Sequence, residues 1–317
     1  MRKIALTTGD PDGIGPEVTA KALRRLGPQD GFSFLVFRDS SSSALFQKLR
    51  RSFQRVVCSS LPEALELPAR AGRLIEIVNE APAPRWVSDA ATSCLRGDVS
   101  GLVTGPLSKT LIQSVFPSDL GHTEILQRVS GVGTIYQGYL GAKFCVVLTT
   151  AHLPLKDVPA HLTKSRIEGA LRQAFHLREV LSPQKRRRPL AFVGLNPHAG
   201  EGGLLGREEL SFRQILARLP NPLRHSVLGP LVPDAAFNPD DWRRYSVYVV
   251  CYHDQGLIPF KMVHGRSSGA QVSLGLPFVR TSVDHGTAKE IAGRGIADPG
   301  SMVDAIQWCL KLTKRGQ

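Results

Sequence analysis

The sequence predicts an α/β protein. Short apolar runs rich in Val, Ile, Leu and Phe alternate with longer segments in which apolar residues recur at helical spacing. Such alternation is typical of βαβ units, whose parallel strands form a sheet that is largely buried. With 317 residues, of which 42% are hydrophobic, the chain is long enough for a pair of such lobes.

The predicted strands follow the apolar runs in chain order, because Val, Ile and Phe favour extended backbone. They cover Ile4–Thr7, Phe32–Phe37, Gly101–Thr104, Phe144–Leu148, Leu190–Gly194 and Val247–Cys251. Helices are predicted between them, and Pro16 suits the first turn of the first one. They cover Pro16–Leu26, Pro84–Arg96, Glu124–Ser130, Thr163–Leu181, Arg207–Leu219 and 300–313.

Three sequence features indicate a cytoplasmic protein that does not contact a membrane. No apolar run approaches the roughly eighteen residues of a membrane span. The start, MRKIALTTGD, reads as a strand and lacks the pattern of a signal peptide. The cysteines are widely spaced without a Cys-x-x-Cys pair, which argues against a disulfide framework or a cysteine zinc site and fits a reducing compartment. They are Cys58, Cys94, Cys145, Cys251 and Cys309.

The formal net charge of +13 allows two interpretations. Clustered Lys and Arg neutralise the phosphates of nucleic acids. Here the arginines are spread over the chain, and the one dense run, Lys185–Arg188, precedes an apolar strand, as an exposed loop would. Because no nucleic-acid-binding module is recognisable, the sequence favours a basic surface and anionic small-molecule substrates over a nucleic-acid partner.

Histidines follow three of the predicted strands. His152, His198 and His253 come shortly after the strands that end at Leu148, Gly194 and Cys251. Ligands of open α/β sheets bind at the carboxyl ends of the strands, and three imidazoles with an open fourth position are typical of a catalytic divalent metal. Three separate structural hydrogen-bonding roles are the alternative, and the spacing leaves both open.

Glycine-rich segments cluster with polar residues at three places. Gly9–Glu17 follows the first strand and opens a helix, where free N–H groups could hold an anion, although a tight turn explains it equally. It is not Gly-x-Gly-x-x-Gly, and the chain has no P-loop. Residues 196–209 combine His, Glu and Arg with four glycines before a helix, which a structural loop seldom needs.

The third cluster runs from Arg280 to Gly300. Arg280 offers a fork for phosphate or carboxylate, and the turn Asp284–Thr287 could hold a nucleotide. A local structural contact between Asp284 and His285 is the alternative. Neither a Gly-x-Ser-x-Gly elbow nor a His-Glu-x-x-His helix occurs, so the hydrolase templates find no support.

Taken together, these motifs resemble the 4-hydroxythreonine-4-phosphate dehydrogenase family of pyridoxal phosphate biosynthesis, almost end to end. The matching segments are GDPDGIGPE at 9–17, TGPLSK at 104–109, GHTE at 121–124, HLPLKDV at 152–158, GLNPHAGE at 194–201, GPLVPD at 229–234, YHDQG at 252–256 and LGLPFVRTSVDHGT at 274–287. The first and last segments also resemble the wider isocitrate and isopropylmalate dehydrogenase superfamily.

The resemblance implies two α/β lobes around a central cleft in a homodimer. The first lobe would be discontinuous, with residues 1–120 and 276–317, and residues 121–275 would form a second lobe that carries the metal ligands and the dimer contacts. It implies one divalent metal per active site (Zn, Mg, Mn or Co) and NAD or NADP. The metal would be shared between the two subunits.

The resemblance also assigns residues to roles. The metal ligands fall on His152, His198 and His253. The substrate contacts fall on His122, Thr123, Lys261 and Arg280, with Gln271 standing where the family pattern has Asn. We expect the cofactor at Gly200, Glu201, Asp284, His285, Gly286 and Thr287. Asp254 and Lys261 are the candidates for catalytic proton transfer, and Asp254 alternatively orients the metal site.

The implied reaction is oxidation of 4-phosphohydroxy-L-threonine to a β-keto acid, which decarboxylates to 3-amino-2-oxopropyl phosphate. A metal-bound hydroxyl would lose its proton more easily while hydride passes to the nicotinamide. Paralogues that act on threonate or erythronate 4-phosphate or on an aromatic cis-dihydrodiol are the alternative, because Gln271 departs from the family pattern. A non-enzymatic binding protein is a third possibility, against which the intact histidine set argues.

Overall fold

The computed structural model describes residues 1–265 and 268–315 and divides into two compact units. Unit 1 comprises Met1–Ile135 and Arg266–Gln317, and unit 2 comprises Tyr136–Gly265. These boundaries differ from the expected ones, 121 and 275. Residues after 120 stay in unit 1 because α6 (His122–Ser130) packs on α4 (Ala83–Arg96). Residues before 276 return to it because β11 (Ala270–Leu274) pairs with β12 (Val279–Ser282).

Unit 1 is built on a sheet with the strand order β3-β4-β2-β1-β5-β12-β11. Its other strands are β1 (Arg2–Thr7), β2 (Phe32–Arg38), β3 (Gln54–Cys58), β4 (Arg73–Val78) and β5 (Gly101–Thr104). Neighbouring strands are parallel except for β11 and β12, which are antiparallel. The carboxyl ends of β1, β5 and β12 therefore meet at one edge, where the Gly9–Glu17 loop begins.

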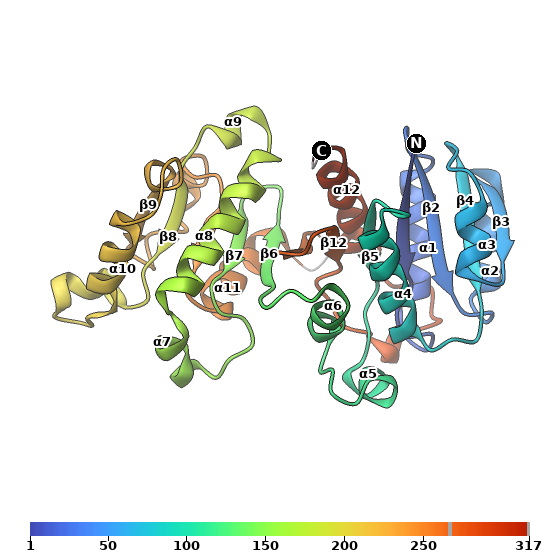
Figure 1. Ribbon diagram of the computed structural model, residues 1–317, viewed down its shortest axis with the longest axis horizontal. Coiled ribbons are helices and arrows are strands. Elements are labelled where there is room, and N and C mark those ends of the chain that lie inside the picture. Colours follow the sequence, from blue (N-terminus) through green and yellow to red (C-terminus); the bar gives the residue numbers. More distant parts are fainter. Residues whose placement is uncertain (266–267, 316–317) are drawn as a thin grey trace. The chain divides into compact units, whose positions relative to one another are not determined.

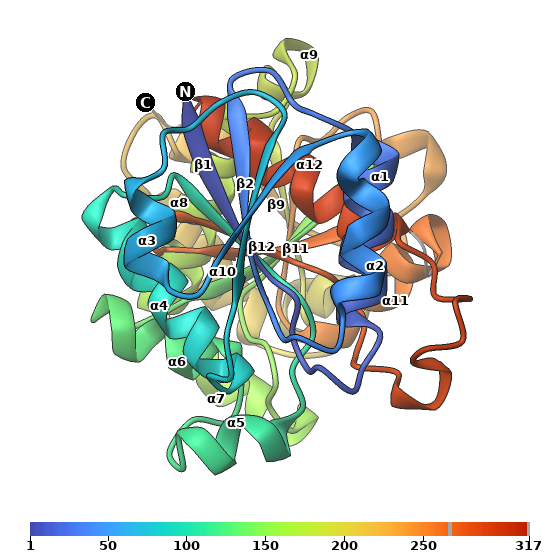
Figure 2. The same ribbon diagram turned by 90° about the vertical axis from the view of Figure 1, so that its right-hand side faces the viewer.

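Helices cover both faces of the unit 1 sheet, as the views in Figures 1 and 2 show. Because side chains alternate along a strand, Ile4 and Leu6 of β1 face one helical layer and Ala5 faces the other. The first layer contains α1 (Gly15–Leu26), α2 (Ser43–Gln47) and α12 (Gly300–Arg315). The second contains α3 (Leu61–Glu66), α4, α5 (Lys109–Val115) and α6. The α/β class predicted from the sequence is thus confirmed.

The strands of unit 2 follow one another in the order β6-β7-β10-β8-β9. Its strands are β6 (Tyr136–Leu140), β7 (Cys145–Leu148), β8 (Leu190–Val193), β9 (Val227–Leu231) and β10 (Tyr248–Val250). β6 runs antiparallel to β7, and the other neighbours are parallel. The helices are α7 (Val158–His161), α8 (Lys164–Glu179), α9 (Pro183–Arg186), α10 (Glu208–Ala217) and α11 (His253–His264).

An aromatic cluster centred on Phe144 forms the core beneath α11. The Phe144 ring lies 5.9 Å from that of Phe260 in α11 and 5.5 Å from that of Tyr248 in β10, both edge-on. Such edge-to-face pairs stabilise the contact beyond the burial of their area. They hold the second half of α11 against the sheet.

Short 3-10 turns connect the regular elements. They are η1 (Lys48–Arg51), η2 (Leu155–Asp157), η3 (Pro197–Gly203), η4 (Arg224–Ser226), η5 (Pro239–Asp241) and η6 (Lys289–Ile291). All five cysteines are buried and free, as expected. Within the described ranges, none of the helices combines the length and apolar character that crossing a membrane requires.

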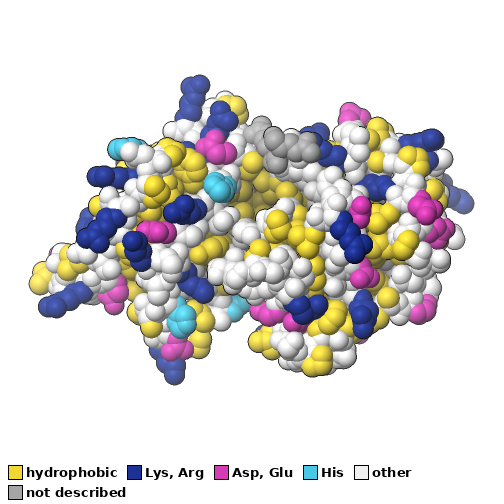
Figure 3. All heavy atoms as spheres, in the orientation of Figure 1, with side chains coloured by type: hydrophobic (Ala, Val, Ile, Leu, Met, Phe, Trp, Pro, Cys, Tyr) yellow, Lys and Arg dark blue, Asp and Glu magenta, His cyan; other side chains and the backbone are white. Residues whose placement is uncertain are grey.

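The expectation that Lys185–Arg188 forms a loop is wrong in part. Lys185 and Arg186 belong to a short helix, α9, because Ser182 caps its N-terminus by accepting a hydrogen bond from the Lys185 backbone, and Pro183 suits the first turn. The run thus ends a helix and leads into β8. Figure 3 shows other Lys and Arg side chains scattered over the visible face rather than gathered in one patch.

Candidate functional site

Two of the three predicted metal-binding histidines lie together in unit 2. His152 follows β7 and His253 opens α11 directly after β10, the strand paired with β7. Their ring centroids lie 5.4 Å apart. His198 follows β8, on the other side of β10, and is exposed. Among the described residues of this one chain, no three His, Cys, Asp or Glu side chains form a group that could hold a metal ion.

Asp254 orients the imidazole of His253. The Nδ1 atom of His253 lies 2.6 Å from Oδ1 of Asp254, which favours the tautomer whose Nε2 carries a lone pair. A histidine held by a carboxylate on one nitrogen and presenting the other is a common metal ligand. The pair therefore fits a divalent metal, and this contact places Asp254 where it would orient His253.

Gln255 ties the two strands next to this pair together. Its Oε1 accepts a 2.7 Å hydrogen bond from the Cys251 backbone at the end of β10, and its Nε2 donates a 2.6 Å bond to the carbonyl of Gly194 after β8. In the motif Tyr252–Gly256, the consecutive residues His253, Asp254 and Gln255 thus supply a candidate metal ligand, the carboxylate that contacts it and a side chain that links two strands.

The loop that carries His198 has an unusual backbone. Five consecutive residues from His198 to Gly202 have φ between 41° and 74°. L-residues with a Cβ rarely adopt this left-handed region, yet His198, Ala199 and Glu201 all do so. Strain of this kind persists only where the surroundings impose it, and it concentrates at functional sites.

In unit 1, Arg280 of β12 lies at the centre of a buried polar network. Its Nη1 donates to Oε1 of Gln271 at 2.6 Å and to Oγ of Ser273 at 3.0 Å, and its Nη2 donates to Oγ1 of Thr104. The side chain is 3% exposed, and none of the three partners is an acid. A guanidinium offers a planar set of donors that suits an anionic ligand such as a phosphate or a carboxylate.

His122, the first residue of α6, lies close enough to Arg280 to sense its charge. Burial lowers the pKa of His122 to about 3, with further contributions from the Arg280 guanidinium and, in the opposite direction, a hydrogen bond with the Gly105 backbone. The imidazole is therefore neutral at physiological pH. Its Nε2 is buried and has no hydrogen-bond partner within the described structure. A buried orphan atom of this kind fits a ligand that completes the bond. Thr123 follows in the first turn of the same helix.

Three loops meet at the carboxyl edge of the unit 1 sheet. The buried carboxylate of Asp10 accepts from the Ser108 backbone, and Lys289 lies 3.4 Å from it and 2.7 Å from Asp12. The Ile14 backbone donates to the carbonyl of Thr287, which joins the Gly9–Glu17 loop to the Asp284–Thr287 turn. A Cβ added to Gly13 would lie 2.9 Å from that carbonyl, so the close approach requires glycine.

The Asp284–Thr287 turn offers groups to a ligand. Asp284 accepts a 2.8 Å bond from Ser301, and Nδ1 of His285 lies 2.9 Å from the Gly286 carbonyl. The Nε2 atom of His285 is buried without a partner in the residues that the structure describes. The turn therefore fits a ligand with hydrogen-bonding capacity.

The predicted residues are thus divided between the units. Unit 1 holds His122, Thr123, Gln271, Arg280 and the turn from Asp284 to Thr287, and unit 2 holds His152, His198, Gly200, Glu201, His253, Asp254 and Lys261. No individual role could be predicted from the sequence for Thr104, Ser273, Asp10 or Glu209. Thr104, Asp10 and Glu209 stand in segments already singled out, so position in a motif was the available signal for these three.

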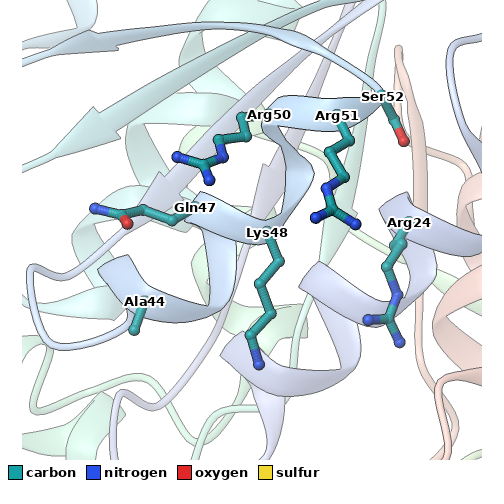
Figure 4. A pocket seen from close by; sticks show the side chains of 7 residues that line it. All are labelled: Arg24, Ala44, Gln47, Lys48, Arg50, Arg51 and Ser52. Carbon is teal, nitrogen blue, oxygen red and sulfur yellow. The ribbon is translucent and has the colours of Figure 1, made fainter.

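A basic pocket lies elsewhere in unit 1, as Figure 4 shows. It has a volume of about 540 Å³ and is lined by Arg24, Ala44, Gln47, Lys48, Arg50, Arg51 and Ser52. Arg24 stands in the last turn of α1, at the opposite end of that helix from the Gly9–Glu17 loop. The pocket is therefore separate from the residues described above.

The chain is similar to known proteins over nearly its whole length. The model of the family described as pyridoxal phosphate biosynthetic protein PdxA matches residues 46–309. The 4-hydroxythreonine-4-phosphate dehydrogenase of Sulfurihydrogenibium sp. is 35% identical over 99% of both chains. The crystal structure of the enzyme of that name from Klebsiella pneumoniae has a TM-score of 0.77 at 28% identity, over 99% of this chain and all of that one. A β-decarboxylating dehydrogenase from Thermococcus kodakarensis, with a TM-score of 0.55 at 18% identity over 98% of this chain and 84% of that one, shares the fold.

Proposed function

Because the chain belongs to the pyridoxal phosphate biosynthetic protein PdxA family, we propose that it is a metal-dependent NAD(P) dehydrogenase that oxidises 4-phosphohydroxy-L-threonine. The product is a β-keto acid that loses carbon dioxide to give 3-amino-2-oxopropyl phosphate. The observation that carries this proposal furthest is the pair of His152 and His253 at the carboxyl ends of neighbouring strands. We further propose a cytoplasmic homodimer in which the metal is shared between subunits.

His152, His253 and His198 are the proposed ligands of one divalent metal, of which zinc, magnesium, manganese and cobalt are candidates. A metal bound there would polarise the substrate hydroxyl and so favour its deprotonation. Asp254 holds the His253 ring in the tautomer that ligation requires. That leaves Lys261, two turns further along α11, for the transfer of the hydroxyl proton.

Arg280 binds the anionic end of the substrate, and the network of Gln271, Ser273 and Thr104 fixes the direction of its guanidinium. His122 is held neutral and can exchange a hydrogen bond with the substrate through Nε2, assisted by Thr123. NAD or NADP accepts the hydride. The Asp284–Thr287 turn and, from unit 2, Gly200 and Glu201 are its proposed contacts.

A test follows the absorbance of reduced nicotinamide with purified protein, divalent metal and a panel of substrates. The panel contains 4-phosphohydroxy-L-threonine, threonate and erythronate 4-phosphates, and an aromatic cis-dihydrodiol, each with and without chelator. We expect chelator-sensitive turnover of the first compound, with NAD and NADP compared separately. Turnover of only one of the other compounds would identify that compound as the substrate. Gln271→Asn would then be the first variant to test. No turnover of any would contradict the proposal.

A further inference from the structure

The strained loop that carries His198 is held by a carboxylate outside it. Glu209, in the first turn of α10, is 2% exposed. Its Oε1 accepts 2.8 and 2.7 Å hydrogen bonds from the backbones of Leu195 and Asn196, and its Oε2 accepts a 2.9 Å bond from Nδ2 of Asn196. Hydrogen bonds to an ionised acceptor are stronger than those between neutral groups, so this clamp is strong.

The loop folds closely over this carboxylate. A Cβ added to Gly200 would lie 2.7 Å from Oε2 of Glu209 and 2.8 Å from the Gly206 carbonyl. Across the loop, the Leu205 backbone donates to the Gly200 carbonyl. The residues from His198 to Gly202 therefore wrap a fixed centre, and their left-handed backbone follows from that geometry rather than from their own preferences.

Glu209 has no ion-pair partner among the residues that the structure describes, so the N–H donors alone compensate its charge. Glu209 also affects the nearby Cys251 thiol. Burial raises the pKa of this thiol most, and the negative charge of Glu209 raises it further. A buried carboxylate without a cation is costly to keep and weak evidence for stability alone. Its hydrogen bonds to Leu195 and Asn196 indicate a role in holding the loop.

We propose that Glu209 is a positioning residue that holds the Asn196–Gly203 loop in its left-handed conformation and thereby presents His198 as a metal ligand. This inference rests on the proposed metal site. It differs from a purely structural role, in which the carboxylate would only favour the N-terminus of α10 through the helix dipole. A structural role changes the free energy of unfolding but leaves metal affinity of the folded protein unchanged.

The test compares metal affinity, measured by competition with a chromophoric chelator for Zn²⁺ and Co²⁺, in the full-length protein and the Glu209→Gln variant. We expect affinity to fall about 10- to 100-fold, the range typical of partners that orient ligands. Amide hydrogen exchange at Leu195 and Asn196 should accelerate. Glu179→Gln, which removes an exposed carboxylate of α8, is the matched control and should leave both unchanged.

A second substitution tests how Glu209 acts. Glycine adopts positive φ without a Cβ penalty, so Ala199→Gly lowers the cost of the loop conformation at a residue with φ of 50°. Combined with Glu209→Gln, it should restore part of the lost metal affinity. Glu209→Asp, which keeps the charge on a shorter side chain, serves if the Gln variant does not fold, and it should also weaken metal binding.

Each outcome of these measurements supports or overturns the proposed role of Glu209. Unchanged metal affinity in Glu209→Gln overturns the inference, as does a wild-type protein that binds no metal. A loss of affinity that Ala199→Gly does not relieve would mean that Glu209 does not act through the conformation of the loop, and this result also overturns the inference. Metal affinities in the expected order, without turnover of any substrate, would refute the proposed reaction and support the role of Glu209.

Discussion

At the scale of single residues, this protein keeps a histidine neutral and an arginine charged within one network. Arg280 is buried, and its guanidinium donates hydrogen bonds to the neutral acceptors Thr104, Gln271 and Ser273. The same charge and the burial of His122 keep that imidazole unprotonated. The result is a site with one fixed positive charge and a neutral hydrogen-bonding group, suited to an anionic ligand.

The neutrality of His122 predicts a pH dependence of stability. Its pKa falls from 6.5 to about 3 on folding, chiefly through burial. Below pH 6.5 the unfolded chain takes up a proton that the folded protein does not bind, so acidification towards pH 3 favours unfolding. Urea unfolding of wild type and His122→Gln at several pH values should show a smaller loss of stability on acidification in the variant.

His225, exposed on η4, provides the matched control for this experiment. His225→Gln should keep the wild-type pH dependence, since carboxylates elsewhere contribute equally to all three proteins. An identical acid sensitivity in wild type and His122→Gln would show that His122 titrates near its ordinary value. It would then also remove the argument that the imidazole meets the substrate in its neutral form.

At the scale of elements, apolar strands could be predicted from the sequence. A strand with a buried charged side chain could not, because its burial depends on partners from other strands. The apolar strand β5 lies at Gly101–Thr104, as predicted, and α1 begins one residue early because Pro16 suits its first turn. β4 was not predicted, since Glu76 lies in its middle. That carboxylate is fully buried because Arg38 of β2 and Arg55 of β3 pair with it, which only the strand order reveals.

Dependence on partners from other strands also limits how much of the site could be predicted from the sequence. His152 and His253 were predictable because each follows an apolar strand, and polar residues at strand ends mark the ligand-binding edge. The partners of Arg280 were not. β12 pairs with β5 in parallel and with β11 in antiparallel register, and this pairing brings Thr104 and Ser273 to the guanidinium. Polar strands such as Val279–Ser282 carry no apolar signal.

The contact of α11 with its sheet allows a prediction at this scale. A Cβ added to Gly256 would lie 2.7 Å from Cγ1 of Val146 in β7 and 2.9 Å from Cγ2 of Val250 in β10. Gly256→Ala should therefore destabilise the protein by about 1–3 kcal/mol through overpacking, despite the better helix propensity of alanine. Urea unfolding measures this change.

Gly133→Ala is the control, because a Cβ there meets nothing within 4 Å. It should change the free energy of unfolding by less than about 0.5 kcal/mol. Because Gly256 lies three residues after His253, its alanine variant should also weaken metal binding by tilting the start of α11. Wild-type stability of Gly256→Ala would mean that the helix shifts freely on the sheet.

At the scale of the whole molecule, the chemistry is divided. Unit 1 carries the anion-binding network around Arg280, and unit 2 carries the histidines and the Glu209-held loop. A twofold-symmetric dimer places two copies of each set in one assembly, so that a complete site can take one set from each subunit. In such a dimer the residues around Arg280 would come from one subunit, and the histidines of the same site would come from the other.

Subunit mixing tests that arrangement. His198→Ala and Arg280→Ala should each abolish turnover, the first with loss of bound metal and the second without it. If each site pairs His198 of one subunit with Arg280 of the other, a mixed dimer has one doubly defective site and one intact site. Random mixing makes half of the dimers mixed, so activity should return to about a quarter of the wild-type value. If mass spectrometry confirms mixed dimers but they are inactive, each site takes both residues from one chain. If size-exclusion chromatography shows that the protein is a monomer, no site is shared between subunits.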